Sequence, residues 1–188
     1  MSTILITGGS GLIGKSLSKA LLAKGYRVII LTRKITDKRP SGNLGYALWN
    51  IKKRQIDIAA LQQADYIIHL TGAGVVDKKW TESYKKEIVD SRTESSRLIV
   101  EALKNNPNQV KAIVSASAIG WYGADDENGK PFTETDEAAD NFLGQTCKLW
   151  EESIEPVTKL NKRLVKLRTG IVLSNNGGAL PEFKRPLL

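Results

Sequence analysis

Residues Thr3–Ser16 read TILITGGSGLIGKS, and this stretch decides the fold class of the 188-residue chain. A short apolar, β-branched run predicts a buried strand, and glycines then crowd the turn that follows it. Helical spacing comes next and ends near Gly25, with an expected buried stripe of Leu12, Ile13, Leu17, Ala20 and Leu21. A strand, a glycine turn and a helix in this order open a parallel sheet and aim a helix N-terminus at an anion.

The same alternation continues to the end of the chain. Further strands are predicted at Arg27–Thr32, Tyr46–Trp49, Tyr66–Leu70, Lys111–Ser115 and Leu164–Arg168. Helices are predicted after a cap at Asp57, over Trp80–Asn105 and over Phe142–Lys159. The long helix should bury Trp80, Tyr84, Ile88, Leu98, Ile99, Ala102 and Leu103. The pattern predicts an α/β fold, a Rossmann-type doubly wound parallel sheet.

Composition sets the organisation of the chain. No composition break divides residues 1–188, so we expect a single domain. The segment 173–188 should be loop at the start of a C-terminal substrate-binding region that is largely absent. Cys147 and His69 are the only residues of their types, which argues against a disulfide and a metal site. No apolar run is long enough to span a bilayer, and we expect a soluble, cytoplasmic protein without membrane contacts.

The net charge of +8 raises the question of a nucleic-acid partner. The basic residues form small groups between acidic ones, including Lys34, Lys38 and Arg39, and no aromatic-rich RNA-binding signature lies among them. We therefore expect no nucleic-acid partner but a small-molecule substrate, and we leave a homodimer open as the assembly.

The glycine turn fits two phosphate-binding patterns. Gly9, Gly11 and Gly14 satisfy the dinucleotide pattern G-x-G-x-x-G, and Gly8 can replace Gly9 in a related spacing. The P-loop pattern of NTPases is satisfied too, by Gly9 and Gly14 followed by Lys15 and Ser16. The dinucleotide is favoured because the helical stripe begins directly after Gly11 and because none of the predicted strands RVIILT, YIIHL and KAIVS ends in an aspartate to hold magnesium.

The end of the second strand distinguishes between the nicotinamide cofactors. Thr32, Arg33 and Lys34 stand about 20 residues beyond the turn, where a carboxylate binds the ribose of NAD and a cation binds the 2′-phosphate of NADP. The chain has no acidic residue before Asp37, so the prediction is NADP(H), with NAD(H) less favoured. An exposed basic loop end is the alternative interpretation of Arg33 and Lys34.

Two further segments, HLTGAG (His69–Gly74) and SASAIGWYG (Ser115–Gly123), follow the turn in the order typical of one family. With them the chain resembles the extended short-chain dehydrogenase/reductases. GAGVVDKKW, FLGQTCKLWE and LRTGIVLSNNGGAL narrow the resemblance to the atypical branch of NAD(P)-dependent epimerase family proteins. The resemblance implies contacts to the pyrophosphate from Thr7, Gly8, Gly9, Ser10, Gly11, Leu12 and Ile13, with Gly14 closing the motif. It also implies contacts to the adenosine phosphate from Arg33, and to the ribose from Leu70, Thr71, Gly72 and Ala73.

The usual catalytic pair of these relatives, a tyrosine and a lysine four residues later, is missing here. Alignment on Glu151 places Leu143 and Cys147 at the two positions, and Lys148 points about 100° away on a helix. Ser117 matches the upstream serine of the family. Tyr122 is a candidate proton donor, although packing or substrate contact is the alternative role.

Three functions stay open at this point. The first is NADP(H)-dependent hydride transfer by an oxidoreductase or nucleoside-sugar epimerase, with Ser117 and Tyr122 polarising a carbonyl. The second is non-catalytic NADP(H) binding. The third is a P-loop NTPase.

Overall fold

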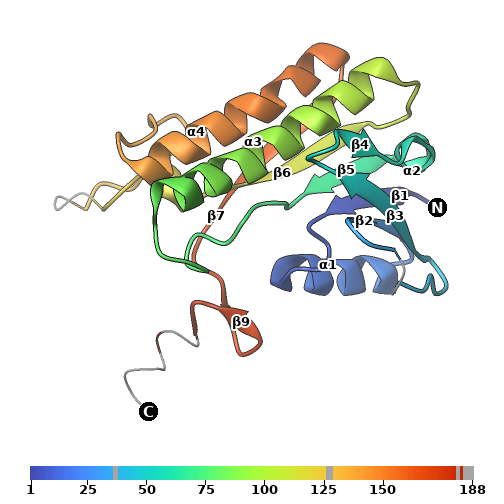
Figure 1. Cartoon of the computed structure of the whole chain (residues 1–188), viewed down its shortest axis with the longest axis horizontal. Helices are drawn as coiled ribbons and strands as arrows, with labels where there is room; N and C mark the ends of the chain where they lie inside the picture. Colours follow the sequence, from blue (N-terminus) through green and yellow to red (C-terminus); the bar gives the residue numbers. More distant parts are fainter. Residues whose placement is uncertain (36–37, 126–128, 181–182, 184–188) are drawn as a thin grey trace.

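The computed structural model describes residues 1–35, 38–125, 129–180 and Phe183. A seven-stranded sheet runs through the molecule in the order β4-β3-β2-β1-β5-β6-β7. Helix α1 covers one face of this sheet, and α3 and α4 lie side by side on the other (Figure 1). The arrangement confirms the predicted α/β, doubly wound fold.

The elements have the following bounds. The sheet contains β1 (Thr3–Thr7), β2 (Arg27–Thr32), β3 (Leu44–Asn50), β4 (Gln55–Ile56), β5 (Tyr66–His69), β6 (Ala112–Ala118) and β7 (Arg163–Thr169). The α-helices are α1 (Leu12–Ala23), α2 (Ile58–Gln63), α3 (Glu82–Asn105) and α4 (Phe142–Ile154). Two 3-10 helices, η1 (Ile119–Trp121) and η2 (Glu155–Leu160), and a hairpin of β8 (Leu173–Ser174) and β9 (Gly177–Gly178) complete them.

The strand order changes direction at β1. The chain proceeds from β1 outward to β2 and β3, and then returns to place β5 against the opposite edge of β1. These neighbours are parallel, whereas β4 pairs with β3 antiparallel. In such sheets ligands bind in the crevice at the carboxyl ends of the strands where the order reverses. Here the strand order reverses between β1 and β5, next to the glycine turn that follows β1.

Alternating residues of the strands face two separate cores. Leu5, Ile29 and Ile67 point toward α3 and α4, where the larger cluster of buried side chains lies. Ile6 and Ile30 point to the other face, toward α1. Because both faces of the central strands are covered, their sequences are continuous apolar runs, which is why the strands were predictable.

The expected apolar stripe of α1 is only partly buried. Leu12, Leu17 and Leu21 are half-buried, whereas Ala20 and Ile13 are exposed, Ile13 to 42%. The buried residues of α1 are Gly14 and Ser18. Small residues face inward because α1 begins so close to the glycine turn that a Cβ at Gly14 would stand 2.4 Å from the carbonyl oxygen of Gly8. Leu21 packs against the core only partially.

Several element boundaries also differ from the prediction. The helix expected to reach Lys159 leaves α-geometry after Ile154, because Pro156 cannot donate the next backbone hydrogen bond. Trp80 precedes α3, is 42% exposed, and donates from its indole to the Val75 carbonyl. Beyond Val172 the chain forms the β8–β9 hairpin where loop was expected. Within the described residues, no helix is both long and apolar enough to cross a membrane.

Candidate functional site

The glycine turn after β1 is folded so tightly that side chains are excluded at several positions. Gly8 adopts a φ of +68°, and the Gly11 amide donates to its carbonyl at 3.0 Å. A Cβ at Gly8 would lie 2.9 Å from the Leu70 carbonyl, and one at Gly9 would lie 2.8 Å from the Ile30 side chain. Glycine therefore lets the turn lie flat on β2 and on the segment after β5.

The N-terminus of α1 differs from those of the other described α-helices. Side-chain oxygens of Asp57, Thr81 and Asn141 accept backbone amides at the starts of α2, α3 and α4. Gly11, at the same position of α1, offers no side-chain cap, and the first turn carries no acidic residue. The amide groups of this first turn therefore remain available to an anionic ligand, which the helix dipole also favours.

Thr7 and His69 lie underneath the turn and brace it. The Thr7 hydroxyl is 2.7 Å from His69 Nδ1 and accepts the Leu70 amide at 3.1 Å. His69 Nε2 is 3.2 Å from the hydroxyls of Ser95 and Ser96. Burial lowers the pKa of His69 to about 3, so the imidazole is neutral. Both side chains are fully buried, and their hydrogen bonds fix the end of β1, where the turn begins, against the end of β5.

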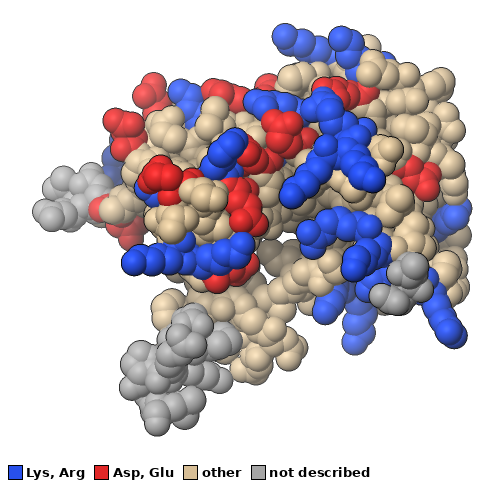
Figure 2. Space-filling model, in the orientation of Figure 1, with Lys and Arg blue, Asp and Glu red and all other residues tan. Residues whose placement is uncertain are grey.

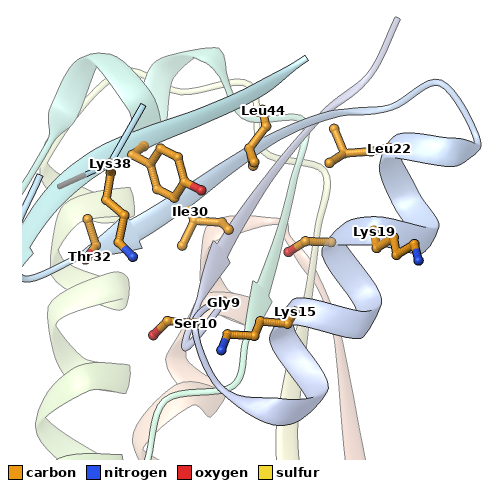
Figure 3. A pocket seen from close by; sticks show the side chains of 11 residues that line it. Gly9, Ser10, Lys15, Lys19, Leu22, Ile30, Thr32, Lys38 and Leu44 are labelled. Carbon is orange, nitrogen blue, oxygen red and sulfur yellow. The ribbon is translucent and has the colours of Figure 1, made fainter. Parts of the chain in front are cut away.

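A pocket of about 300 Å³ opens beside the turn, between α1 and the ends of β2 and β3. Ile30, Leu44 and Tyr46 form its apolar wall. Figure 3 shows Lys15 reaching toward Ser10, and the amine of Lys38 beside Thr32. The apolar wall suits the flat face of an aromatic base, and the lysines suit a phosphate group beside it.

Not all of the predicted adenosine-end residues line this pocket. Thr32 does, whereas Arg33 and Lys34 are exposed at the end of β2 and are not part of the lining. Lys15 and Lys38 do line it, and the sequence interpretation did not assign them to the cofactor. The basic group of Lys34, Lys38 and Arg39 was the available signal for Lys38.

The segment after β5 forms the other side of the crevice. Leu70 and Thr71 touch the glycine turn through Gly8, and Ala73 is anchored by its amide to the Ser91 hydroxyl at 2.9 Å. The Thr71 hydroxyl is buried without a hydrogen-bond partner among the described residues. A buried polar atom of this kind usually finds its partner in water or a ligand.

The surface charge around α1 is one-sided. Lys15 and Lys19 lie on this helix, which contains no acidic residue. Figure 2 shows basic and acidic side chains mixed over α3 and α4, and mainly basic ones near α1. The local potential there favours an anionic ligand.

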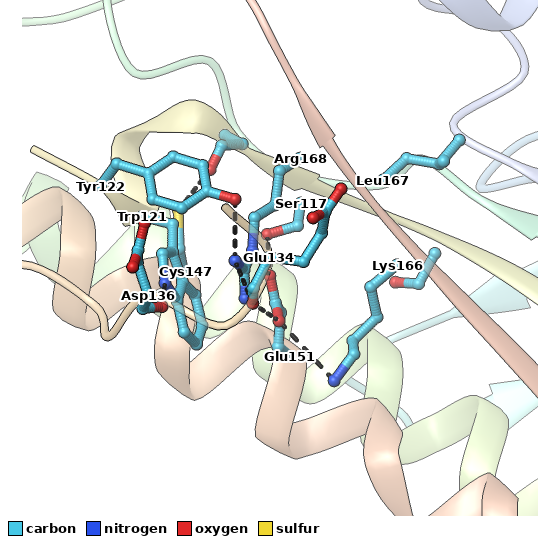
Figure 4. Close-up of polar contacts among 12 residues, drawn as sticks. Ser117, Trp121, Tyr122, Glu134, Asp136, Cys147, Glu151, Lys166, Leu167 and Arg168 are labelled. Carbon is cyan, nitrogen blue, oxygen red and sulfur yellow. Dashed lines mark hydrogen bonds and ion pairs between the residues drawn. The ribbon is translucent and has the colours of Figure 1, made fainter. Parts of the chain in front are cut away.

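The two catalytic candidates belong to one hydrogen-bond network at the carboxyl ends of β6 and β7 (Figure 4). Ser117 on β6 donates to Glu151 Oε1 at 2.6 Å. Arg168 on β7 donates to both oxygens of Glu151, at 2.9 and 3.2 Å, and to the Tyr122 hydroxyl at 3.0 Å. Ser117 and Tyr122 are thus linked through the ion pair of Glu151 and Arg168.

Charge in this network is well compensated. Burial alone would raise the pKa of Glu151. The hydrogen bonds from Arg168 and Ser117 lower it by more than burial raises it, so the pKa lies below its usual value. Arg168 also stacks on the Trp121 ring at 3.7 Å from the centroid. The carboxylate is therefore ionised at neutral pH and holds Ser117 by accepting a hydrogen bond from its hydroxyl.

The network limits what each candidate can do. Ser117 is 3% exposed, and its proton is directed at Glu151. Tyr122 keeps partial exposure, stacks on Phe132 at 5.0 Å, and accepts a hydrogen bond from Arg168. A phenol that accepts from a guanidinium still has its own proton to donate. Tyr122 is thus the better placed of the two for proton transfer.

Helix α4 lacks the usual pair, as the sequence indicates. Cys147 is buried, 3.7 Å from the Ala118 carbonyl oxygen, and burial raises the pKa of its thiol. Leu143 packs close to Gly120, and Lys148 lies on the exposed side of the helix.

The P-loop interpretation fits the geometry poorly. A single backbone hydrogen bond closes the turn from Gly8 to Gly11, and α1 already begins at Leu12, before Lys15. A loop that wraps a triphosphate needs more chain between the strand and the helix.

Comparisons with known proteins agree with this geometry. The NAD dependent epimerase/dehydratase family matches residues 4–147. An epimerase family protein of Staphylococcus saprophyticus is 35% identical over 188 residues, which cover 99% of this chain and 60% of that protein. An epimerase family protein of Bacillus subtilis is 32% identical over 179 residues, which cover 95% of this chain and 57% of that one.

Solved structures show the same fold. A nucleoside-diphosphate sugar epimerase from Corynebacterium glutamicum superposes with a TM-score of 0.79 at 33% identity, covering 99% of this chain and 37% of that one. A human epimerase family protein solved with NADPH superposes with a TM-score of 0.75 at 26% identity, covering 98% and 59%.

The chain spans about 60% of the length of the curated relatives that it matches. Because the family profile covers most of the sequence and includes the glycine turn, this chain belongs to the NAD dependent epimerase/dehydratase family.

Proposed function

We propose that this chain binds NADP(H) across the carboxyl ends of β1, β2 and β5, and that it supports hydride transfer with a carbonyl or hydroxyl substrate. The observation that carries the proposal is the uncapped N-terminus of α1 behind a turn that requires glycine. The human relative was solved with NADPH, and the Corynebacterium relative is described as a nucleoside-diphosphate sugar epimerase. A nucleotide sugar is accordingly the substrate class that we favour.

In this proposal, different residues bind different parts of the dinucleotide. Main-chain amides from Gly9 to Gly14 would receive the diphosphate, and the unpaired Thr71 hydroxyl would face the ribose at Leu70–Ala73. The cofactor supplies the hydride donor or acceptor at its nicotinamide ring. The protein's part is to position that ring and to move a proton.

The preference for NADP(H) rests on the end of β2. Thr32, Arg33 and Lys34 offer no carboxylate to a ribose hydroxyl, and Lys38 adds a cation in the pocket wall. Cations and hydroxyls bind a 2′-phosphate, whereas NAD is usually held there by an acid.

In this proposal, Tyr122 is the residue that transfers the proton. Arg168 fixes its hydroxyl, and Ser117 acts indirectly by holding Glu151, which in turn holds Arg168. Leu143 and Cys147 at the usual catalytic positions favour a second candidate, a protein that binds NADP(H) without turnover.

Calorimetric titration tests the cofactor. We expect NADPH to bind at least about tenfold tighter than NADH, because one charged hydrogen bond is worth about 1.5–3 kcal/mol. Lys38→Met should reduce this preference, and Lys52→Met, a change at an exposed lysine away from the pocket, should leave it unchanged. Equal affinities for the two nucleotides would refute the NADP(H) assignment.

Turnover separates the two candidates. NADPH oxidation is followed with a panel of carbonyl compounds and keto-sugar nucleotides. Turnover that Tyr122→Phe abolishes, with NADPH affinity kept, supports the enzyme. Saturable NADPH binding without turnover on the panel selects the non-catalytic candidate.

A further inference from the structure

Arg92, near the middle of α3, has an environment that neither the fold nor the network around Arg168 explains. Its guanidinium carbon is 3.0 Å from the position of a Cβ built at Gly72, and it lies 5.0 Å from the centroid of the Trp150 ring. The guanidinium therefore lies between the segment after β5 and helix α4. Gly72 is exposed and Arg92 is half-buried, so the guanidinium lies beside the segment that borders the crevice.

Among the described residues, the charge of Arg92 has no acidic partner. Its Nη1 donates to the Ile88 carbonyl of its own helix at 2.8 Å, and none of the ion pairs among the described residues includes it. Burial lowers its pKa, and the ionisable groups that face it are the Cys147 thiol and the Tyr84 phenol. Arg168, by contrast, is paired with Glu151.

Other unpaired polar atoms come from the same two segments. Within the described part of the chain, Thr71, which precedes Gly72, has a buried hydroxyl without a partner, and the indole nitrogen of Trp150 is buried without an acceptor. A guanidinium and an indole can only donate hydrogen bonds. Among the described residues, this surrounding therefore offers the guanidinium no negatively charged acceptor.

Packing alone accounts poorly for a cation here. Arg92 is half-buried. Stacking on an aromatic ring contributes modestly, whereas a partly desolvated charge without an acidic partner is unfavourable. A carboxylate or phosphate oxygen supplied by a ligand would satisfy both the charge and the donors.

We propose that Arg92 is an anion-binding residue of the reaction site, which takes a phosphate or carboxylate group beside Gly72. This inference rests on the proposed function for its site, because the same segment borders the dinucleotide crevice. Two sources can supply the anion: the cofactor's own diphosphate, or an acidic group on the substrate.

Calorimetry on the full chain tests the proposal with Arg92→Met, which keeps length and removes charge, and with Arg92→Lys. Arg97→Met is the matched control, because Arg97 lies on the same helix, exposed and paired with Glu94. Each protein is titrated with NADPH and with adenosine 2′,5′-bisphosphate, which lacks the nicotinamide half. Inorganic phosphate is then titrated into the NADPH-saturated protein and into the free protein.

Either source produces a distinct result. If the anion is the nicotinamide-side phosphate of the diphosphate, which the bisphosphate lacks, Arg92→Met weakens NADPH about tenfold and leaves the bisphosphate unchanged. If it belongs to the substrate, NADPH affinity is kept and phosphate binding to the saturated protein falls about tenfold. In both cases Arg92→Lys restores part of the affinity.

The proposal is overturned if folded Arg92→Met equals Arg97→Met in every titration. It is equally overturned if all ligands weaken together with a lower melting temperature, since that is the signature of a purely structural role. Should wild-type protein fail to bind NADPH, the proposed function fails separately, and phosphate titration of the free protein still tests Arg92.

Discussion

Replacing Gly14 by alanine tests how closely the glycine turn and α1 depend on each other. The added Cβ would lie 2.4 Å from the Gly8 carbonyl oxygen and 2.6 Å from the Gly9 Cα. Both are backbone atoms, so the turn or the helix must move. Overpacking of this kind costs about 1–3 kcal/mol, and the helix propensity of alanine returns up to about 1 kcal/mol. We expect a net loss of about 1–2 kcal/mol.

Binding should suffer more than stability. A displaced turn misaligns several amides that would face the diphosphate, and the loss of one charged hydrogen bond is already about tenfold in affinity. Urea unfolding of the cofactor-free protein measures the first effect, and NADPH calorimetry the second. Gly170→Ala is the control, because a Cβ there meets nothing within 4 Å. If Gly14→Ala unfolds and binds NADPH as Gly170→Ala does, the close approach at the turn is not required.

Three further predictions concern buried groups. Burial lowers the pKa of His69 to about 3, so as the pH falls below 6.5 the unfolded chain binds a proton at this residue before the folded chain does. The unfolding free energy should therefore decrease by about 1.4 kcal/mol per pH unit. Urea unfolding at pH 7.5 and at pH 5 should show a smaller decrease of this free energy in His69→Gln than in the wild type. Glu151→Gln leaves the buried end of Arg168 uncompensated and should lower the unfolding free energy by about 3 kcal/mol, whereas an effect below 0.5 kcal/mol would show that the pair contributes little. Cys147, with its pKa raised by burial, should resist a thiol reagent until denaturant is added; fast labelling of the native protein would contradict its placement.

The sheet could be predicted because its central strands are covered on both faces. RVIILT and YIIHL are continuous apolar runs, and each lies at the expected place between helical segments. The glycine turn was equally predictable, because the spacing of Gly8, Gly11 and Gly14 reflects backbone contacts within the turn itself. The inner face of α1 was not, since apolar periodicity cannot indicate that Gly14 and Ser18 are the residues that face inward.

The polar network and the lysines of the pocket depend on contacts between distant segments. Ser117 and Arg168 lie on two strands, and Glu151 lies on a helix. Ser117 is 34 residues from Glu151 along the chain, and Arg168 is 17 residues from it. Their spacing carries no signal until β6 and β7 lie side by side. Arg92 was equally hidden, because nothing in its own helix shows that Gly72 and Trp150 enclose it.

A crystal structure of the protein grown with NADPH tests the central claim most directly. The account predicts the diphosphate within hydrogen-bond distance of main-chain amides in the first turn of α1, with the 2′-phosphate between Thr32 and Lys38. A dinucleotide bound elsewhere, or a diphosphate that makes no contact with these amides, would contradict it.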